Sequence, residues 1–288
     1  MLKSFSSPRL RLAAALAMLA ALGGCGLLKA PTVQTDQIKT DAEGRLAEWL
    51  PADVLLLGEQ HDAPEHQTRQ RQLVAALAAR GQLAALAMEM ADSGGSTAGL
   101  AANASEAQAR SALGWQAQAW PWEAYGPVVM AAVRAGVPVL GANLPRTQMR
   151  DSMADAQLDQ RLPGPALKAQ QQLIRQGHCD LLPESQIRPM TRIQIARDVR
   201  MAQTVAQAAR AGQVVVLVSG SVHADKQLGV PQHLPQTLRV KAIRLKAGPA
   251  DADSKGESFD SVWLSPALPD TDHCAGLKER LGPAKAKQ

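Results

Sequence analysis

The chain has 288 residues, of which 46% are hydrophobic and 20% charged, so it is long enough to bury one sizeable core. Its formal net charge is +5, but Lys3, Arg9 and Arg11 stand in the first 24 residues, which carry no acidic residue. Without that segment the balance is +2 (5 − 3). So small a surplus removes strong basicity as an argument for nucleic-acid binding, and we expect no nucleic-acid partner.

The N-terminal segment has the features of a bacterial lipoprotein signal. Its three basic residues precede an apolar stretch, residues 12–22, that is too short to span a membrane as a mature helix. Residues 22–25, Leu-Gly-Gly-Cys, resemble a lipobox, in which the cysteine is lipidated and becomes the first residue. We therefore expect a signal peptide over 1–24 and a membrane anchor at Cys25, with plain secretion as the alternative. Gly26, rather than an aspartate, resembles the pattern that sends Gram-negative lipoproteins to the outer membrane.

The rest of the chain divides into a tether over 25–40, a single domain over 41–274 and a tail over 275–288. Short apolar runs rich in Val and Leu are typical of parallel strands buried on both faces. They occur at 53–57, 83–88, 137–140 and 214–219, and a last strand is expected at 261–264 after an exposed loop over 246–257.

Helical patterns alternate with these strands. Helices are expected over 64–80 and 124–135. A longer helical region over 166–211, broken near 177–183 and kinked at Pro189, forms an insertion between the third and fourth strands. The alternation predicts an α/β fold with a mostly parallel sheet flanked by helices.

Cys179 and Cys274 are the two cysteines that remain once Cys25 carries lipid. In an oxidising compartment, an even pair favours a disulfide that ties the tail to the middle of the chain. Two free thiols are the alternative.

Polar residues follow the ends of the expected strands. Residues 58–61, Gly-Glu-Gln-His, follow the first strand, and residues 220–223, Gly-Ser-Val-His, follow the fourth. Glu89 and Asn143 end the second and third. Because the carboxyl ends of parallel strands meet at one edge of the sheet, we expect these polar residues to lie together along that edge, which we call the rim. Two histidines with two carboxylates suit a metal or haem site. The alternative is that each residue serves only a turn, a helix dipole or local packing.

Seven motifs in this order resemble the ChaN family of the Tiki superfamily, whose members share paired Gly-x-x-His motifs. They extend over roughly 54–235 and comprise residues 57–62, 89–90, 143–146, 177–179, 194–198, 201–202 and 220–223, with Gly-Val-Pro at 229–231. The resemblance implies a haem-binding lipoprotein of bacterial haem and iron uptake. Its expected partners are haem, the membrane through its lipid, an outer-membrane haem receptor and a second copy of the chain.

Haem needs an axial ligand, an apolar slot and cations for its propionates. Tyr125 is the single tyrosine and lies in a segment, 115–125, that holds four of the eight aromatic residues, although core packing explains that segment equally. His178 lies beside Cys179 in a loop that could reach the rim, or it is merely exposed. Covalent attachment lacks its Cys-x-x-Cys-His motif. The candidate haem-binding residues are Tyr125, His178, His61, His223, Arg146 and Arg197, the two arginines serving propionates.

The same superfamily resemblance leaves a hydrolase open, since relatives include metal-dependent proteases and esterase-like enzymes. In that interpretation His61 and His223 bind Zn, Mn or Co together with Glu89 or Glu59, and the remaining carboxylate acts as general base on a bound water. No His-Glu-x-x-His or Gly-x-Ser-x-Gly signature supports it. A third possibility is a lipoprotein that only binds a protein partner.

Overall fold

The computed structural model describes residues 33–250 and 257–281. Within that range, the residues from Ile38 onward belong to one compact unit, which contains the whole sheet. The expected signal peptide, Cys25 and the first part of the expected tether lie outside the described residues, as do 282–288 of the expected tail.

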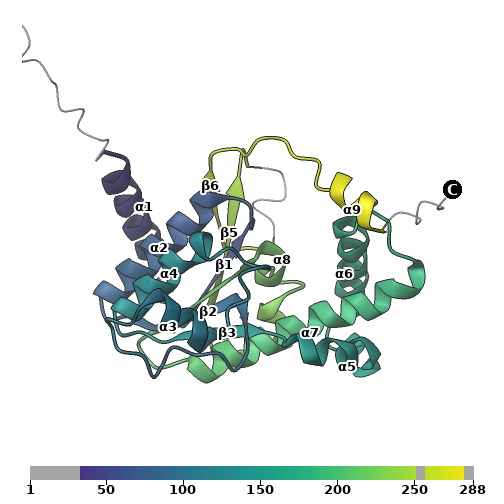
Figure 1. Ribbon diagram of the computed structural model, residues 1–288, viewed down its shortest axis with the longest axis horizontal. Coiled ribbons are helices and arrows are strands. Elements are labelled where there is room, and N and C mark those ends of the chain that lie inside the picture. Colours follow the sequence, from purple (N-terminus) through teal and green to yellow (C-terminus); the bar gives the residue numbers. More distant parts are fainter. Residues whose placement is uncertain (1–32, 251–256, 282–288) are drawn as a thin grey trace, which may run out of the picture. The chain divides into compact units, whose positions relative to one another are not determined.

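The centre of this unit is a six-stranded sheet in which every strand pair is parallel, in the order β3-β2-β4-β1-β5-β6 (Figure 1). The strands are β1 (Val54–Glu59), β2 (Leu83–Asp92), β3 (Val139–Asn143), β4 (Val214–Gly220), β5 (Val240–Ala247) and β6 (Ser261–Ser265). The prediction of an α/β fold with a mostly parallel sheet is confirmed.

Strand β5 was not predicted from the sequence. It pairs with both β1 and β6, and it buries Ala242, Ile243 and Leu245. Lys241, Arg244 and Lys246 interrupt its apolar run, because this strand is only half-buried and lacks the continuous pattern of the central strands. The loop expected from residue 246 therefore begins slightly later.

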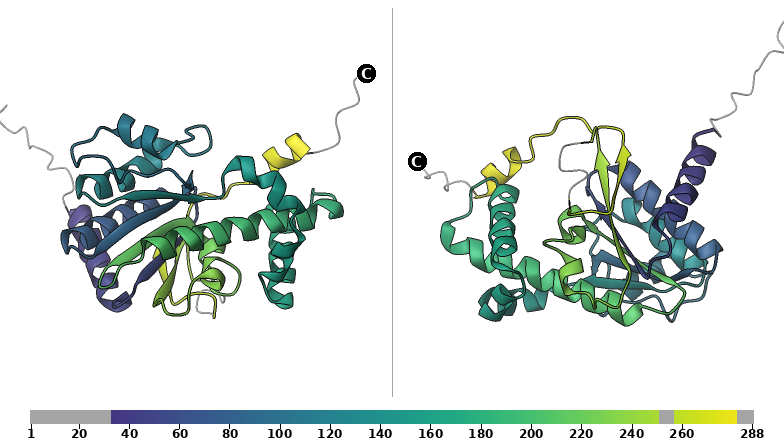
Figure 2. Two further views of the ribbon diagram at one scale, coloured as in Figure 1. Left: turned by 90° about the horizontal axis from the view of Figure 1, so that it is seen from below. Right: turned by 180° about the vertical axis from the view of Figure 1, so that it is seen from behind.

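Helices lie on both faces of the sheet (Figure 2). The predicted helices at 64–80 and 124–135 correspond to α2 and α4, and the predicted helical region at 166–211 corresponds to α6 and α7, with Pro189 inside α7. The described helices are α1 (Val33–Trp49), α2 (Pro64–Ala79), α3 (Glu106–Leu113), α4 (Trp122–Arg134), α5 (Met149–Ala154), α6 (Gly164–Gly177), α7 (Glu184–Ala208), α8 (Ser221–Ala224) and α9 (Ala275–Leu281), with short 3-10 turns η1 (Arg146–Gln148), η2 (Ala156–Gln160) and η3 (Val230–His233).

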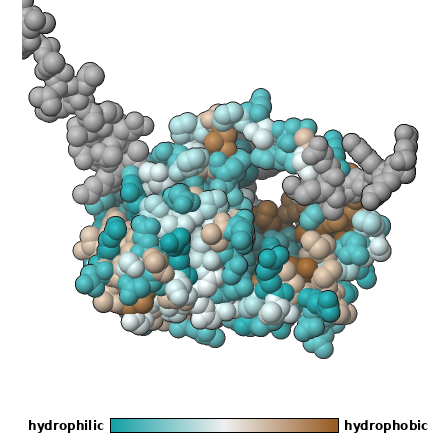
Figure 3. Space-filling view, viewed as in Figure 1, coloured by the Kyte–Doolittle hydropathy of each residue, from teal (hydrophilic) through white to brown (hydrophobic). Residues whose placement is uncertain are grey.

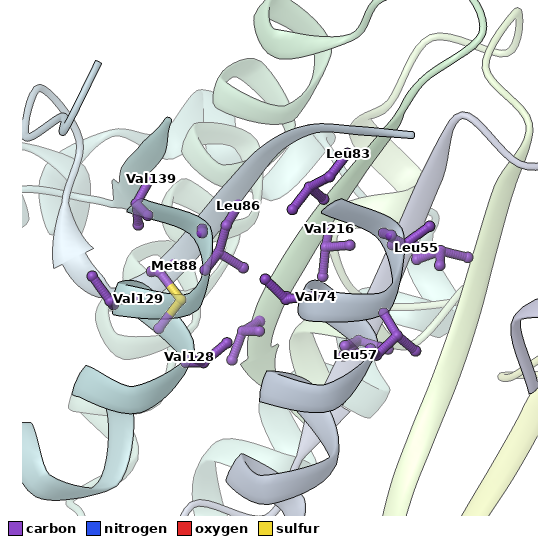
Figure 4. Close-up of a cluster of buried hydrophobic side chains, with 14 of the residues drawn as sticks. Leu55, Leu57, Val74, Leu83, Leu86, Met88, Val128, Val129, Val139 and Val216 are labelled. Carbon is purple, nitrogen blue, oxygen red and sulfur yellow. The ribbon is translucent and has the colours of Figure 1, made fainter. Parts of the chain in front are cut away.

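Alternate side chains of the strands enter two different cores, as a period of two requires. On one face, Leu57, Leu86 and Met88 pack with α2 and α4, whose Val74 and Val128 point at the sheet (Figure 4). On the other face, a second cluster joins the sheet to α7 through Leu56, Val215, Leu217, Met201 and Val205. Both faces are buried, which explains the uninterrupted apolar runs of the central strands.

Helix α1 begins inside the segment expected to be a tether. Its buried residues Ala42, Leu46 and Trp49 recur every three to four positions and form one apolar stripe. Trp49 meets Trp263 of β6 edge to face, with ring centroids 5.6 Å apart, and the Trp263 Nε1–H donates to Asp41 at 2.7 Å. Docking on β6 stabilises a helix whose own sequence is weakly periodic.

Cys179, just after α6, and Cys274, just before α9, are joined in a disulfide. This is the pairing that the sequence favours over two free thiols. The bond links positions 95 residues apart.

Gly58 is the point where β1 passes closest to α8, and it gives a testable prediction. A Cβ there would lie 2.8 Å from both the Ala224 Cβ and the Ser221 Cα, so we expect Gly58→Ala to lower the free energy of unfolding by about 1–3 kcal/mol. Gly44, exposed within α1, has no atom within 4 Å of its Cβ position, and Gly44→Ala should raise stability by up to about 1 kcal/mol. Urea unfolding measures both, and equal effects would contradict this packing.

Candidate functional site

The predicted rim exists at the carboxyl edge of the sheet. Glu59 ends β1, Glu89 lies near the end of β2, Asn143 ends β3, and His223 lies in α8 directly after β4. Glu59 pairs in register with Gly220 of the neighbouring strand. All four side chains are buried, Glu59 and Glu89 being 1% and 4% exposed. A buried carboxylate requires hydrogen-bond donors or opposite charge, so the partners of these two carboxylates are described first.

Glu59 accepts four hydrogen bonds from side chains. Gln70 Nε2 donates at 2.6 Å and Gln67 Nε2 at 3.1 Å, both to Oε2, while the Tyr125 hydroxyl donates to Oε1 at 2.6 Å. The fourth donor is Nδ1 of His61, 2.8 Å from Oε1. Two helices, α2 and α4, therefore fix the position and orientation of one carboxylate.

Tyr125 takes part in this network as a donor and not as an exposed ligand. It is 2% exposed, and burial together with the nearby Glu59 charge raises its pKa above the usual range for tyrosine. The phenol thus stays protonated and turned toward Glu59. That Tyr125 is an axial haem ligand stays a prediction, because the structure shows only that its hydroxyl donates to Glu59.

His61 has one engaged nitrogen and one open nitrogen. Because Glu59 accepts from Nδ1, the Nε2 atom carries the lone pair in the neutral ring, and no hydrogen-bond partner for Nε2 exists among the described residues. The side chain is 40% exposed, and its ring meets Trp120 edge to face with centroids 4.9 Å apart. Burial would lower the pKa of His61, but Glu59 and Glu89 outweigh that effect and raise it.

His223 is sealed between two carboxylates. Its Nδ1 lies 2.5 Å from Asp198 Oδ1, and its Nε2 lies 3.4 Å from Glu89 Oε1. Burial would lower the pKa of His223, yet these two charges outweigh it and raise the pKa to about 10. The ring is therefore an imidazolium at neutral pH, with both nitrogens donating. The amide nitrogen of Gln194 lies 3.0 Å from Nε2 and encloses the ring, but as a donor it cannot bond to a protonated Nε2.

The two carboxylates around His223 differ in their pKa values. Burial would raise the pKa of Glu89, but His223, His61 and the Gly220 N–H, which donates to Oε2 at 2.7 Å, lower it to about 2. Burial dominates at Asp198 and raises its pKa to about 6 despite the contact with His223. Glu89 is thus a firmly ionised, weakly basic group.

The prediction of a divalent-metal site at His61, Glu89 and His223 is not supported. Within residues 33–250 and 257–281, no group of three or more His, Cys, Asp or Glu side chains is arranged to hold a metal ion. At His223 both ring nitrogens face carboxylates, Asp198 at 2.5 Å and Glu89 at 3.4 Å. Both oxygens of Glu89 already accept hydrogen bonds.

His178 does not join the rim in the described contacts. It caps α6, and its Nδ1 bonds the Ile174 carbonyl at 2.8 Å. Figure 3 shows a hollow with hydrophobic residues on its wall between α6 and the sheet. A cavity of about 460 Å³ between α6 and α8 is lined by Leu173, Val222 and Phe259.

Arg146 and Arg197 do come to the rim. With Glu89, Asn143 and Trp120 they line a cavity of about 330 Å³. Asn143 places its Oδ1 on the N–H of Leu144 at 2.8 Å and leaves its amide nitrogen as a donor. The two arginines come from η1 and from α7, so the insertion between β3 and β4 supplies the positive charge.

Several site residues were missed in the sequence, although a signal for two of them exists. Gln70 lies on the same helical stripe as Leu73 and Leu77, and Asp198 lies on the stripe of Ile195 and Val205. A polar residue inside an apolar stripe is buried and needs a partner, so these two could have been found. The partners Gln67 and Gln194 carry no such signal.

His66 is a further buried histidine that supports the rim from behind. Its Nδ1 accepts the N–H of Gln60 at 3.1 Å, and its Nε2 bonds Ser265 Oγ at 3.0 Å. Burial lowers its pKa to about 4, so the ring is neutral at physiological pH. This neutral acceptor holds the turn that carries Glu59 and His61.

The protein is of the α/β class, with a parallel sheet and two glycine–histidine motifs at the carboxyl edge of that sheet. The chain belongs to the family described as "Haem-binding uptake, Tiki superfamily, ChaN", whose model matches residues 45–234. No curated protein sequence matches it.

The comparison with solved structures also gave matches. The structure described as "Cofacial heme binding to ChaN of Campylobacter jejuni" has 26% identity and a TM-score of 0.63, covering 76% of this chain and 90% of that one. The type III effector HopBA1 matches with 14% identity and a TM-score of 0.37, covering 79% of this chain and 94% of that one. The Campylobacter protein is the relative that informs the site.

The sealed ion pairs of His223 predict its titration. An unperturbed histidine titrates near 6.5, so the stability from the His223 charge is lost as pH rises from there toward about 10, and the ion pair with Asp198 is also lost below about 6, where that carboxyl becomes protonated. We expect ¹⁵N NMR to show both ring nitrogens of His223 protonated at pH 8, and Asp198→Asn to lower its pKa. A wild-type His223 that becomes neutral near pH 6.5 would show that the ion pairs do not form in solution.

Proposed function

We propose that the protein is a haem-binding lipoprotein of bacterial haem uptake and that His61 is the axial ligand, through its Nε2 atom. The observation that carries this proposal is the hydrogen bond from His61 Nδ1 to the buried Glu59. Histidines that bind metals commonly donate their other ring N–H to a carboxylate, which fixes the tautomer and aims the free nitrogen. His61 has this arrangement.

The surroundings of His61 fit a haem. Its side chain is 40% exposed, so part of the imidazole is open to a large planar ligand. Trp120 and Tyr125, which pack edge to face with centroids 5.8 Å apart, provide apolar surface beside it. Bound haem would supply an iron centre. The chain's own contribution is to orient the imidazole through Glu59, Gln67 and Gln70.

The role in uptake rests on the sequence outside the described residues. The basic and apolar segment over 1–24 and the lipobox cysteine, Cys25, support a lipid anchor, and Gly26 supports the outer membrane. No helix of the described chain is both long and apolar enough to cross a membrane. In this proposal lipid is the attachment, and an outer-membrane haem receptor is the partner that delivers or accepts haem.

We include a homodimer in the proposal. The Campylobacter relative is described as binding haem cofacially. If haem contacts two subunits, its ligand must lie at an exposed edge of each subunit. His61 occupies such a position. A haem-dependent doubling of mass in light scattering would support the dimer, and an unchanged monomer at full loading would contradict it.

A haemin titration of the fragment from Gly26 onward tests the ligand. We expect wild type to bind haemin with a shifted Soret band, and His61→Ala to lose that shift because the Nε2 ligand is gone. Added imidazole should restore the band if the cavity left by the side chain is intact.

Two histidines serve as matched controls. His273→Ala, at a side chain that is 68% exposed, and His178→Ala should leave the titration unchanged. Loss of the Soret shift in His178→Ala but not in His61→Ala would overturn the assignment and move the haem to the cavity beside α6. Tyr125→Phe should keep the band, because its hydroxyl faces Glu59.

A further inference from the structure

A second large cavity lies along the flank of the sheet and shares no lining residue with the cavity at the rim. Its volume is about 560 Å³, against about 330 Å³ for the cavity beside Glu89. Pro138, which precedes β3, and Pro145, which follows it, both line this space, so it extends along the whole length of that edge strand. Helix α7, which crosses one face of the sheet, forms a facing wall (Figure 2). We call this space the flank cavity, and its volume is typical of small-ligand sites.

The α7 wall of the flank cavity is polar. Its main lining residues recur every three to four positions and so share one face of the helix: Arg200, Gln203, Thr204 and Gln207. The neighbouring stripe of α7, which includes Met201 and Val205, is buried on the sheet. Within the part of the chain that the structure describes, the amide groups of Gln203 and Gln207 have no hydrogen-bond partner. Each amide can therefore both donate to a ligand and accept from it.

The flank cavity carries positive charge without opposing negative charge. Its lining residues, all within the described chain, include Arg200 and Arg210 but no Asp or Glu. Arg200 donates to the neutral amide oxygen of Gln148 at 3.0 Å, and Arg210 is exposed and forms no ion pair with any described residue. Arginines outside the cavity do find carboxylates, as Arg192 does with Asp159 at 2.8 Å. Two uncompensated guanidinium groups favour an anionic ligand.

These two arginines lie toward opposite ends of the flank cavity. An α-helix rises ~1.5 Å per residue, so Arg200 and the end of α7 at Ala208 are about 12 Å apart, and Arg210 lies just beyond. Arg210 also lines a smaller cavity of about 200 Å³, together with Pro138 at the start of β3. Arg200 instead contacts Gln148 of η1, which follows the carboxyl end of β3. A ligand that meets both guanidinium groups must therefore be elongated.

The wall opposite α7 consists mainly of backbone and small side chains. The segment that follows β2 lies along the outer edge of β3, where the Gly141 N–H donates to the Gly95 carbonyl at 2.9 Å and the Thr97 N–H donates to the Val139 carbonyl at 3.0 Å. The backbone groups of this edge are thus already paired. An extended peptide cannot add to β3 as a further strand, so the side chains of the α7 wall must recognise the ligand.

We propose that the flank cavity binds an anionic oligosaccharide, a short sugar chain that carries carboxylate or phosphate groups. Arg200 and Arg210 hold the charged groups through paired N–H donors. Gln203 and Gln207 lie between the two arginines and suit sugar hydroxyls, because a carboxamide offers both a donor and an acceptor. This site is independent of the proposed haem binding at the rim.

Calorimetric titration with trigalacturonate, a trisaccharide with a carboxylate on each ring, tests the proposal, and maltotriose is the neutral comparison. We expect wild type to bind trigalacturonate at least about tenfold more tightly than maltotriose. Arg200→Gln and Arg210→Gln should each weaken trigalacturonate roughly tenfold, the value of one charged hydrogen bond, and leave maltotriose unchanged. Gln207→Leu should weaken both sugars, because it removes contacts with hydroxyls. Arg150→Gln, at an exposed arginine of α5 outside the cavity, is the control and should behave as wild type.

Maltotriose phosphorylated at its reducing end decides which anion the cavity prefers. If it binds more tightly than trigalacturonate and Arg200→Gln removes the difference, the charged group is a phosphate. Failure of both charged sugars to bind wild type, or binding that neither arginine substitution weakens, would overturn the proposal. So would a hexaglutamate peptide that binds where the charged sugars do not, since the ligand would then be an acidic peptide. Thermal unfolding midpoints equal to that of wild type show that each variant is folded.

Discussion

Two buried carboxylates at the carboxyl edge of the sheet, Glu59 and Glu89, are the constraint on which the site depends. A carboxylate that loses water must regain hydrogen bonds or opposite charge from the protein, since the unmatched cost is several kcal/mol. Glu59 accepts hydrogen bonds from Gln70 of α2 and Tyr125 of α4. Glu89 accepts a hydrogen bond from Gly220 of β4 and forms an ion pair with His223 of α8. Elements distant in sequence are thereby fixed around one rim.

The two glycine–histidine motifs reach opposite chemical states because their second partners differ. His223 meets a second carboxylate, Asp198, on its other nitrogen, so it is locked as a buried cation. His61 has one carboxylate partner, Glu59, and its Nε2 atom lies beside Gly220 without a hydrogen-bond partner among the described residues. The same local pattern thus gives one buried ion pair and one half-exposed histidine. A motif alone does not determine which of the two roles its histidine takes.

Topology made much of this site predictable. Once the runs at 53–57 and 214–219 are taken as parallel strands, Glu59 and His223 must lie at one edge. What could not be predicted depends on side-chain direction and on partners from distant helices. Tyr125 turns its hydroxyl inward, which its aromatic neighbours in sequence do not reveal. Strand β5 was hidden because its charged residues break the apolar run, and α1 because its docking surface, Trp263, lies over 200 residues away.

The hydrogen bonding of the rim also argues for binding over hydrolysis. A general base needs a lone pair free to accept a proton and a pKa near the working pH. Both oxygens of Glu59 accept two side-chain hydrogen bonds each, and the pKa of Glu89 is held at about 2. Neither group can serve as an efficient base. Nε2 of His61 has no hydrogen-bond partner among the described residues, and Glu59 orients the ring through Nδ1, which is the arrangement that the proposed role as a ligand needs.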